Sequence, residues 1–444
     1  MTVRTNLKTS PVWHPFTQAK TAPLPLKVRK GYGVTLELED GRQIIDCISS
    51  WWVNLHGHSH PEIAKAIYEQ AQTLEHVMLP GFIHEPAENL AAGVLRHLPK
   101  NLQYVFFSDN GTTAVEIAMK MAYQYWQNKN TPERNKFIAF DQGYHGETVG
   151  AMSLGKTSPF FKRFQALLFD IDLVPFPETW DGDKKVEEKE QAALSCLQKL
   201  LEANPNQYAG IIVEPLIQAV SGMKMCRINF MQALEKIARQ ANLLVIYDEA
   251  MTGFGRTGDW FACTKAGTTP DIVCLAKGLT GGFMPLALNV ATDEIYQAFY
   301  DDDLQKALFH SHSYMGNPLA CTAANASLKL LEDNPAKFSQ MENLHRKFLE
   351  KWLKDNPFLE KFRVCGTAVA FDVVTKDQTN YFNAVSLPMR HKFLELGFLI
   401  RPLGNSIYLL PPYCITEAEL ESAYEAISKV IAAVIAPLNC AIPV

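Results

Sequence analysis

Short apolar runs alternate with longer segments of helical periodicity through the middle of the chain. The runs are rich in β-branched and aromatic residues and are bounded by glycine or polar residues, so we expect them to be strands. The expected strands are residues 104–107, 136–140, 210–213, 243–247, 271–275 and 286–291. Strands that alternate with helices predict an α/β fold with a doubly wound, mostly parallel sheet.

Polar and glycine-rich motifs directly follow four of these expected strands. In open α/β sheets, ligands bind beyond the carboxyl ends of the strands, so the motifs are expected to meet at one edge of the sheet. The pattern of residues changes near residue 330, where segments of charged, helix-like sequence precede two further strand-like runs. We therefore predict a large ligand-binding domain over residues 56–329 and a small domain that combines residues 1–55 with residues 330–444.

Length and composition agree with a two-domain protein whose partner is a small molecule. The chain has 444 residues, more than a single hydrophobic core usually organises. Its formal net charge of -5 argues against the basic surface that nucleic-acid binding needs. The cysteines are scattered without a C-x-x-C pair, and no apolar run approaches ~20 residues. We therefore expect a cytoplasmic protein with no membrane span and no nucleic-acid partner.

Lys277 is the first candidate for chemistry. It follows the expected strand 271–275 within two residues, between Ala276 and Gly278. Most lysines are solvated surface charges. A lysine at the end of a buried strand must instead be neutralised, paired or covalently bound, and its small neighbours leave room for a planar group. Because lysine amines form imines with carbonyl groups, we interpret Lys277 as the residue that binds an aldehyde cofactor.

Asp248 ends the apolar run 243–247 and is delivered to the same edge of the sheet. Alone, it reads best as a helix cap. Paired with an imine lysine, its carboxylate can keep a pyridine nitrogen protonated, and a protonated ring accepts electrons from a carbanion. At ~4 Å and an effective dielectric of ~20, that attraction is roughly 4 kcal/mol, equivalent to about three pKa units.

The segment 108–113 reads S-D-N-G-T-T between an expected strand and a helix. Free N–H groups at such a helix start can cradle a phosphate, with Gly111 allowing close approach and Thr112 adding a hydroxyl. A plain capped turn is the alternative. Neither a P-loop nor a dinucleotide fingerprint occurs in this segment.

Aromatic and histidine motifs complete the candidates. Tyr144 follows another expected strand and can stack on a pyridine ring, although aromatic residues at strand ends usually pack in the core. Trp51 lies in S-S-W-W at 49–52, and it too can either border a cofactor site or pack in the core. The motif H-G-H-S-H at 56–60 suggests a metal site, but no acidic or thiol ligand is near it in the sequence. We expect no metal.

In this order, the motifs resemble those of the class III, fold-type I aminotransferases. They are S-D-N-G-T at 108–112, G-Y-H-G at 143–146, V-E-P at 213–215, D-E-x-x-T-G-F-G-R-T-G at 248–258 and L-A-K-G-L-T-G-G at 275–282. Within that family, W-H-P-F-T at 13–17, the double tryptophan and Y-M-G-N-P-L-A at 314–320 look most like the diaminopelargonic acid aminotransferases. The resemblance implies a large domain with a mostly parallel seven-stranded sheet flanked by helices, a smaller α+β domain, and pyridoxal 5′-phosphate as cofactor.

The resemblance also implies roles for particular residues. Lys277 would carry the cofactor and move the proton, Asp248 would pair with the ring nitrogen, and Tyr144 would stack on the ring. The implied cofactor-binding residues are Gly111, Thr112, Tyr144, Asp248, Lys277, His312 and Ser313. The implied substrate-binding residues are Phe16, Trp51, Tyr144, Ser311 and Arg401. Because Ser313 resembles a hydroxyl that reaches the site from the neighbouring subunit, a homodimer is expected.

The implied reaction transfers an amino group to 8-amino-7-oxononanoate and yields 7,8-diaminononanoate in biotin synthesis. Arg401 would grip the substrate carboxylate through two hydrogen bonds, and S-adenosylmethionine is the implied donor. Two positions depart from the family pattern: Phe16 replaces a tyrosine, and Met251 stands where many related enzymes have glutamine. Lysine is the alternative donor. Another class III ω-aminotransferase, or a regulatory cofactor-binding protein without turnover, are the alternative functions.

Overall fold

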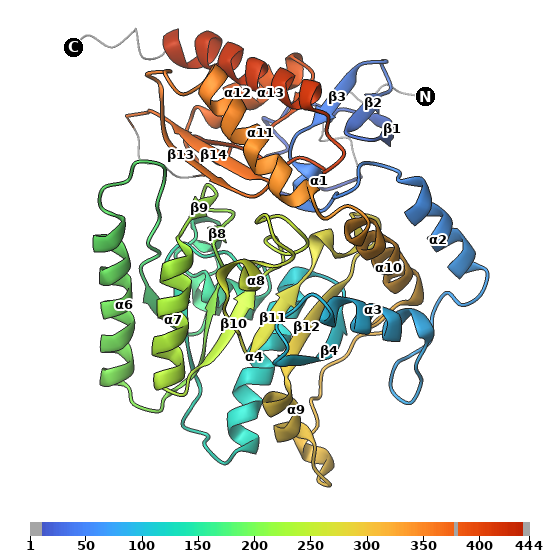
Figure 1. Ribbon diagram of the computed structural model, residues 1–444, viewed down its shortest axis with the longest axis vertical. Helices are drawn as coiled ribbons and strands as arrows, with labels where there is room; N and C mark the ends of the chain where they lie inside the picture. The colour runs from blue at the N-terminus through green and yellow to red at the C-terminus, as the bar shows by residue number, and fades with distance from the viewer. Residues whose placement is uncertain (1–10, 377–380, 438–444) are drawn as a thin grey trace.

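The computed structural model describes residues 11–376 and 381–437. At its centre lies a seven-stranded sheet with the strand order β4-β12-β11-β10-β7-β5-β6 (Figure 1). Within this sheet β12 pairs antiparallel with β4 and β11, and the other pairs are parallel. The predicted α/β class and mostly parallel seven-stranded sheet are confirmed. The strands are β4 (Leu102–Ser108), β5 (Lys136–Phe140), β6 (Asp172–Val174), β7 (Tyr208–Val213), β10 (Leu244–Asp248), β11 (Ile272–Leu275) and β12 (Ala287–Thr292).

Six of these strands overlap the expected ones, and β6 is the strand that the sequence did not predict. It has the three residues Asp-Leu-Val and lies at the end of the sheet, paired with β5. A run this short has too few apolar positions to show either strand or helix periodicity. Its pairing with β5 is therefore a tertiary contact rather than a local preference.

Alternate residues of the central strands face opposite helical layers. Ile246 of β10 belongs to one core with Ala118 of helix α4 (Gly111–Asn128). Val245 and Tyr247 belong to the other core, with Leu234 of helix α7 (Ile228–Gln240). Burial on both faces explains why these strands read as continuous apolar runs. The other helices of this layered unit are α5 (Val149–Leu154), α6 (Val186–Ala203), α8 (Ala262–Ala266) and α9 (Asp293–Phe299).

A second lobe lies beyond one edge of the large sheet (Figure 1). Its four-stranded sheet hydrogen-bonds β15 near the end of the chain to β3 near its start. This pairing supports our proposal that residues 1–55 and 330–444 form one small domain beside a large domain of residues 56–329. Its elements are β1 (Val28–Tyr32), β2 (Thr35–Leu38), β3 (Gln43–Asp46), α11 (Lys337–Trp352), β13 (Leu359–Cys365), β14 (Ala368–Val373), α12 (Ser386–Glu395), β15 (Phe398–Leu399), β16 (Ser406–Leu409) and α13 (Glu417–Val430).

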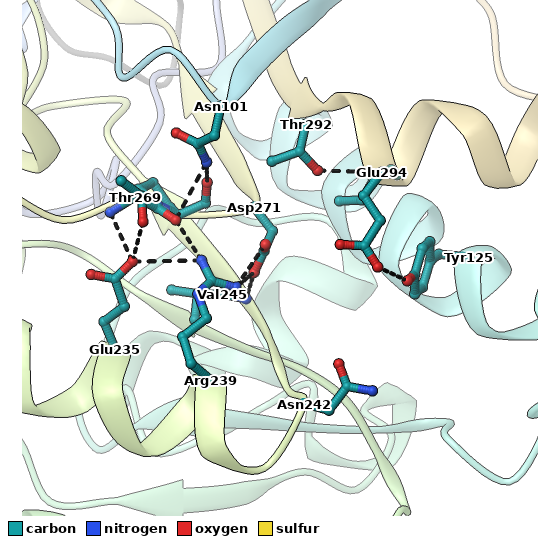
Figure 2. Close-up of polar contacts among 12 residues, drawn as sticks. Asn101, Tyr125, Glu235, Arg239, Asn242, Val245, Thr269, Asp271, Thr292 and Glu294 are labelled. Atoms are coloured by element: carbon teal, nitrogen blue, oxygen red, sulfur yellow. Dashed lines mark hydrogen bonds and ion pairs between the residues drawn. The ribbon is translucent and has the colours of Figure 1, made fainter.

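A polar network fixes the amino ends of β10 and β11 (Figure 2). Asp271, just before β11, accepts a hydrogen bond from the backbone N–H of Val245 at 2.7 Å and pairs with Arg239 of α7 at 2.7 Å. Helix α7 is thereby attached to both strands at the edge opposite the candidate motifs. The carboxyl edge is left to hold the functional residues.

Three helices lie beside the large sheet: α2 (Pro61–Ala71), α3 (Glu85–Leu95) and α10 (Pro318–Glu332). Helix α2 begins at Pro61. Helix α10 packs on α2 and α3 and also contacts the turn Lys277–Thr280. Among residues 11–376 and 381–437, no helix has the length and apolar character needed to cross a bilayer.

Candidate active site

The motifs that follow the strands meet at the carboxyl edge of the large sheet and enclose a cavity of about 550 Å³. The sequence predicted this edge, and it brings together residues from five separate segments. The predicted residues that line the cavity are Gly111, Thr112, Tyr144, Asp248 and Lys277.

Lys277 stands two residues beyond the end of β11 and opens the short 3-10 turn Lys277–Thr280. Its amine lies 5.2 Å from the centroid of the Trp52 ring. It makes no hydrogen bond or ion pair with any residue that the structure describes. Burial lowers the pKa of Lys277, and Asp248 and Glu214 partly oppose that shift. A lowered pKa increases the fraction of neutral amine, which is the form that attacks a carbonyl group.

Asp248 ends β10 and contacts a buried histidine. Its Oδ2 atom lies 2.8 Å from Nδ1 of His145, and its Oδ1 atom accepts a hydrogen bond from the N–H of Ala250 at 3.1 Å. Burial alone would lower the pKa of His145, but the hydrogen bond and the charge of Asp248 raise it above its ordinary value. No helix begins at Asp248 in the described chain, so the capping interpretation is wrong. The other carboxylate oxygen instead closes a local turn.

Glu214 of the V-E-P motif lies beside this pair. Its two carboxylate oxygens accept hydrogen bonds from the backbone N–H groups of Tyr144 and Ala219, both at 2.9 Å. Burial, with a contribution from the Asp248 carboxylate, raises the pKa of Glu214 to about 7. Glu214 therefore ties the loop that carries Tyr144 and His145 to the end of β7.

The start of α4 faces the cavity as the sequence predicted. Asn110 caps the helix by accepting a hydrogen bond from the N–H of Thr113 at 2.9 Å. A Cβ atom on Gly111 would lie 3.2 Å from Cβ of Ala250, so glycine keeps the backbone accessible there. The hydroxyl of Thr112 accepts a hydrogen bond from the N–H of Glu147 at 3.1 Å. Open N–H groups and a hydroxyl at the start of a long helix suit a phosphate.

An aromatic wall forms beside the cavity from distant parts of the chain. Phe16 lies 5.7 Å from Trp51 and 5.5 Å from Phe160, measured between ring centroids. The guanidinium of Arg401 lies 4.7 Å from the centroid of Trp51 and donates a hydrogen bond to the hydroxyl of Tyr381 at 3.0 Å. Within the described chain Arg401 has no carboxylate partner. An apolar surface that ends in such an arginine suits an aliphatic carboxylate.

Comparisons with known proteins agree with this geometry. The family model for aminotransferase class III matches residues 16–431. The chain belongs to the class III aminotransferases. It is similar to the adenosylmethionine-8-amino-7-oxononanoate aminotransferase of Synechococcus elongatus, with 50% identity over 95% of this chain and 98% of the relative. The enzyme of the same name from Geobacter sulfurreducens is 35% identical over 95% of both chains.

Solved structures resemble this aminotransferase over nearly its whole length. The crystal structure of adenosylmethionine-8-amino-7-oxononanoate aminotransferase from Methanocaldococcus jannaschii has a TM-score of 0.88 and 36% identity, covering 96% of this chain and 97% of its own. A PLP-bound amine transaminase from an uncultivated Pseudomonas species has a TM-score of 0.89 and 26% identity, covering 96% and 99%. Pyridoxal 5′-phosphate is the cofactor of this family. The buried amine, the carboxylate and the open helix start described above fit it.

The aminotransferase chain does not bring Ser311, His312 and Ser313 into its own cavity. None of the three lines it, and the side chains of Ser311 and Ser313 are exposed. The flanking residues Phe309 and Tyr314 are 66% and 68% exposed, which is high for aromatic side chains. The segment therefore does not line the cavity of its own chain.

The histidine motif forms hydrogen bonds rather than a metal cluster. His58 lies 3.0 Å from a carboxylate oxygen of Asp46, and His56 lies 2.9 Å from the hydroxyl of Ser327. The sequence interpretation found no acidic residue near these histidines, whereas the fold brings Asp46 to His58. Over residues 11–376 and 381–437, no three potential ligands gather closely enough to bind a metal ion.

Several residues of the site were not assigned a role from the sequence. His145 and Glu214 lay inside quoted motifs, and their positions after strands were the available signal. Phe160 lies in the 3-10 turn Pro159–Phe161 and Tyr381 in a loop, neither within a motif, and only the fold brings their ring centroids to 4.5 Å. Met251 lines a small neighbouring cavity together with Lys277 and Trp52. Unlike a glutamine, its side chain has no amide that could hydrogen-bond to the cofactor.

Proposed function

We propose that this aminotransferase converts 8-amino-7-oxononanoate to 7,8-diaminononanoate in biotin synthesis, with S-adenosylmethionine as the amino donor. The observation that carries the proposal is Arg401, a cation without a carboxylate partner in the described chain, at the end of an aromatic wall. The acceptor has a carboxylate at the end of an aliphatic chain. The names of the Synechococcus, Geobacter and Methanocaldococcus relatives support the same substrate.

In this proposal the residues at the sheet edge divide the work between binding and proton transfer. When bound, pyridoxal 5′-phosphate supplies a ring that withdraws electrons from the carbon that loses a proton. The amine of Lys277 holds the cofactor and then moves the proton. Asp248 holds positive charge at the ring nitrogen, and His145 keeps Asp248 oriented through their 2.8 Å contact. Gly111 and Thr112 bind the phosphate.

The aromatic wall orients the acceptor and limits water around the reacting carbon. Arg401 forms a bidentate pair with the acceptor carboxylate, and the hydrogen bond to Tyr381 helps to hold the guanidinium over Trp51. The aliphatic chain then lies along Phe16 and Phe160. Tyr144 covers the cofactor, and its hydroxyl donates to a Glu147 oxygen at 2.6 Å, which holds the ring in place.

We also propose that the active enzyme is a homodimer. The segment that carries Ser311, His312 and Ser313 does not line the cavity of its own chain, and both of its serines are exposed. Exposed aromatic residues beside it favour burial against another copy. In a twofold dimer the segment reaches the partner's phosphate site, so each site uses residues of both chains.

Phe16 bears most directly on the identity of the amino donor. A tyrosine at this position offers a donor both a ring face and a hydrogen bond, whereas Phe16 offers only the face. Losing one neutral hydrogen bond costs roughly 0.5 to 1.5 kcal/mol, which weakens S-adenosylmethionine binding without preventing it. Lysine, a smaller amine, loses less.

The test follows the cofactor absorbance while the purified enzyme is mixed with S-adenosylmethionine, lysine or a panel of ω-amino acids. S-adenosylmethionine should change the spectrum fastest, and 8-amino-7-oxononanoate should then restore it. Phe16→Tyr should improve S-adenosylmethionine use by no more than about tenfold. If lysine alone changes the spectrum, the donor assignment is wrong. If 8-amino-7-oxononanoate never restores the spectrum, the acceptor assignment is wrong.

A further inference from the structure

The two tryptophans of the site lie on a backbone turn of unusual handedness. Ser49, Ser50, Trp51 and Trp52 have φ angles of 51°, 45°, 73° and 76°. Side chains of L-residues disfavour this left-handed region, and it usually occurs at single residues. A run of such residues persists only where the surroundings impose it, and strained backbone of this kind is common at functional sites.

The turn directs neighbouring tryptophans to different parts of the site. Trp52 is 3% exposed, and its indole N–H donates to the hydroxyl of Tyr408 at 3.0 Å while its face meets the amine of Lys277. Trp51 is 41% exposed, and its face lies against Arg401. The handedness of the turn therefore determines the placement of both rings.

A buried carboxylate holds the amino side of the turn. Asp46 is fully buried and accepts hydrogen bonds from the N–H of Ile48 at 3.1 Å and from the hydroxyl of Ser50 at 2.7 Å. Its Oδ2 atom also lies 3.0 Å from Nε2 of His58. The other ring nitrogen of His58 lies 3.2 Å from the amide nitrogen of Asn54. A neutral His58 that donates to Asp46 and accepts from Asn54 satisfies both contacts.

A buried arginine holds the carboxyl side of the turn. Arg256, in the G-F-G-R-T-G segment, is 1% exposed and has no ion-pair partner among the residues that the structure describes. Its guanidinium donates to the carbonyls of Trp52 at 3.3 Å, Asn54 at 3.2 Å and Pro411 at 2.8 Å. Its hydrogen bonds all go to backbone carbonyls, and the guanidinium also lies 5.3 Å from the centroid of the Tyr413 ring. A buried cation held in this way fixes the path of the chain.

We propose that Asp46, His58 and Arg256 are positioning residues that hold Ser49–Trp52 in its left-handed conformation. Through that turn they place Trp52 against Lys277 and Trp51 beneath Arg401. The effect on substrate rests on the function proposed above, in which Trp51 borders the acceptor. The claim of backbone strain does not depend on that proposed function, so a melting experiment tests it separately.

The strain is tested by comparing Ser50→Gly with Ser50→Ala in the full chain. Both variants lose the hydrogen bond to Asp46, but only glycine adopts a positive φ without cost. Ser50→Gly should therefore melt roughly 1 to 3 °C above Ser50→Ala. Ser422, in the right-handed helix α13, is the matched control, and there alanine should melt above glycine. Equal or reversed melting temperatures at position 50 would overturn the claim of strain.

Positioning is tested at His58, because a purely structural residue would change stability alone. His58→Leu should raise the KM for the acceptor by roughly three- to tenfold, more than it lowers kcat. It should also weaken the near-ultraviolet circular dichroism of the tryptophans. His58→Gln, which keeps one donor and one acceptor, should restore both signals to within about twofold. If His58→Leu lowers only the melting temperature and leaves KM and the tryptophan signal unchanged, the proposal is wrong.

Discussion

The contact between Asp248 and His145 should make the two side chains act as one unit in cofactor binding and catalysis. We expect Asp248→Asn to keep the shape of the site but to lose the negative charge. His145→Phe keeps a ring of similar size but removes the hydrogen bond. Each variant should still bind the phosphate through Gly111 and Thr112, and each should lose most of its turnover.

The size of the coupling follows from the distance and the burial. At 2.8 Å, a unit charge pair attracts by about 6 kcal/mol at an effective dielectric of about 20. Both side chains are nearly excluded from water, so the cost of burying the charges cancels much of this attraction. A net coupling of roughly 1.5 to 3 kcal/mol is typical of a hydrogen bond to a charged group. This corresponds to about ten- to 150-fold in a rate or dissociation constant.

The assay is a double-mutant cycle on the purified protein, with cofactor binding measured on the apoprotein and the half-reaction measured after the cofactor has been added. The dissociation constant for pyridoxal 5′-phosphate and the rate of the amine half-reaction are measured for the wild type, both single variants and the double variant. Asp172→Asn is a suitable control, because Asp172 also lies in a strand of the sheet but bonds Tyr208 at 2.7 Å, away from the cavity. It should leave both constants unchanged.

The sign of the pH dependence gives a second check. Asp248 raises the pKa of His145 in the folded protein. The coupling should therefore be complete below the ordinary histidine pKa and should decline as the pH rises through the raised value. If the free-energy changes of the two single variants sum to that of the double variant within about 0.5 kcal/mol, the idea that His145 acts through Asp248 is refuted.

Three further predictions concern separate parts of the molecule. In Lys277→Ala, borohydride should no longer attach the cofactor to the chain, and a persisting lysine adduct in the mass spectrum would show that another residue carries it. Arg401→Ala should cost roughly 2 to 5 kcal/mol in kcat/KM for the acceptor, whereas a wild type that accepts the acid and its methyl ester equally would contradict the assigned role. Burial lowers the pKa of His345 to about 4, so about 3 kcal/mol of stability should be present above pH ~6.5 and lost as the pH falls through 4. In urea unfolding, His345→Gln should lose less unfolding free energy than the wild type over that pH range. Equal losses in the variant and the wild type would refute the prediction.

Much of the site was predictable because its residues follow strands directly. Lys277, Asp248 and Tyr144 each come after an apolar run, and parallel strands end at the same edge of a sheet. Gly111 and Thr112 were predictable from the strand-to-helix junction that carries them. Local sequence is sufficient in these cases, because the strand determines where the next residue must lie.

Other residues beside the cavity were not predictable in the same way. Phe160 and Tyr381 have no periodic pattern around them, and their contact joins two segments that lie far apart in the chain. The Asp46–His58 pair was not predictable from the sequence, because Asp46 is the last residue of β3 and His58 lies in the separate histidine segment.

Sequence by itself determined the fold class, the edge of the sheet at which the candidate residues meet and the lysine that we propose carries the cofactor. These features depend on hydrophobic periodicity and chain order, which are local properties. Only the tertiary structure decided the left-handed turn that places Trp51 and Trp52, the pairing of His145 with Asp248, and the absence of residues 311–313 from the cavity lining of their own chain. Those features depend on contacts between segments far apart in the chain, and backbone strain there is balanced by hydrogen bonds that no local pattern records.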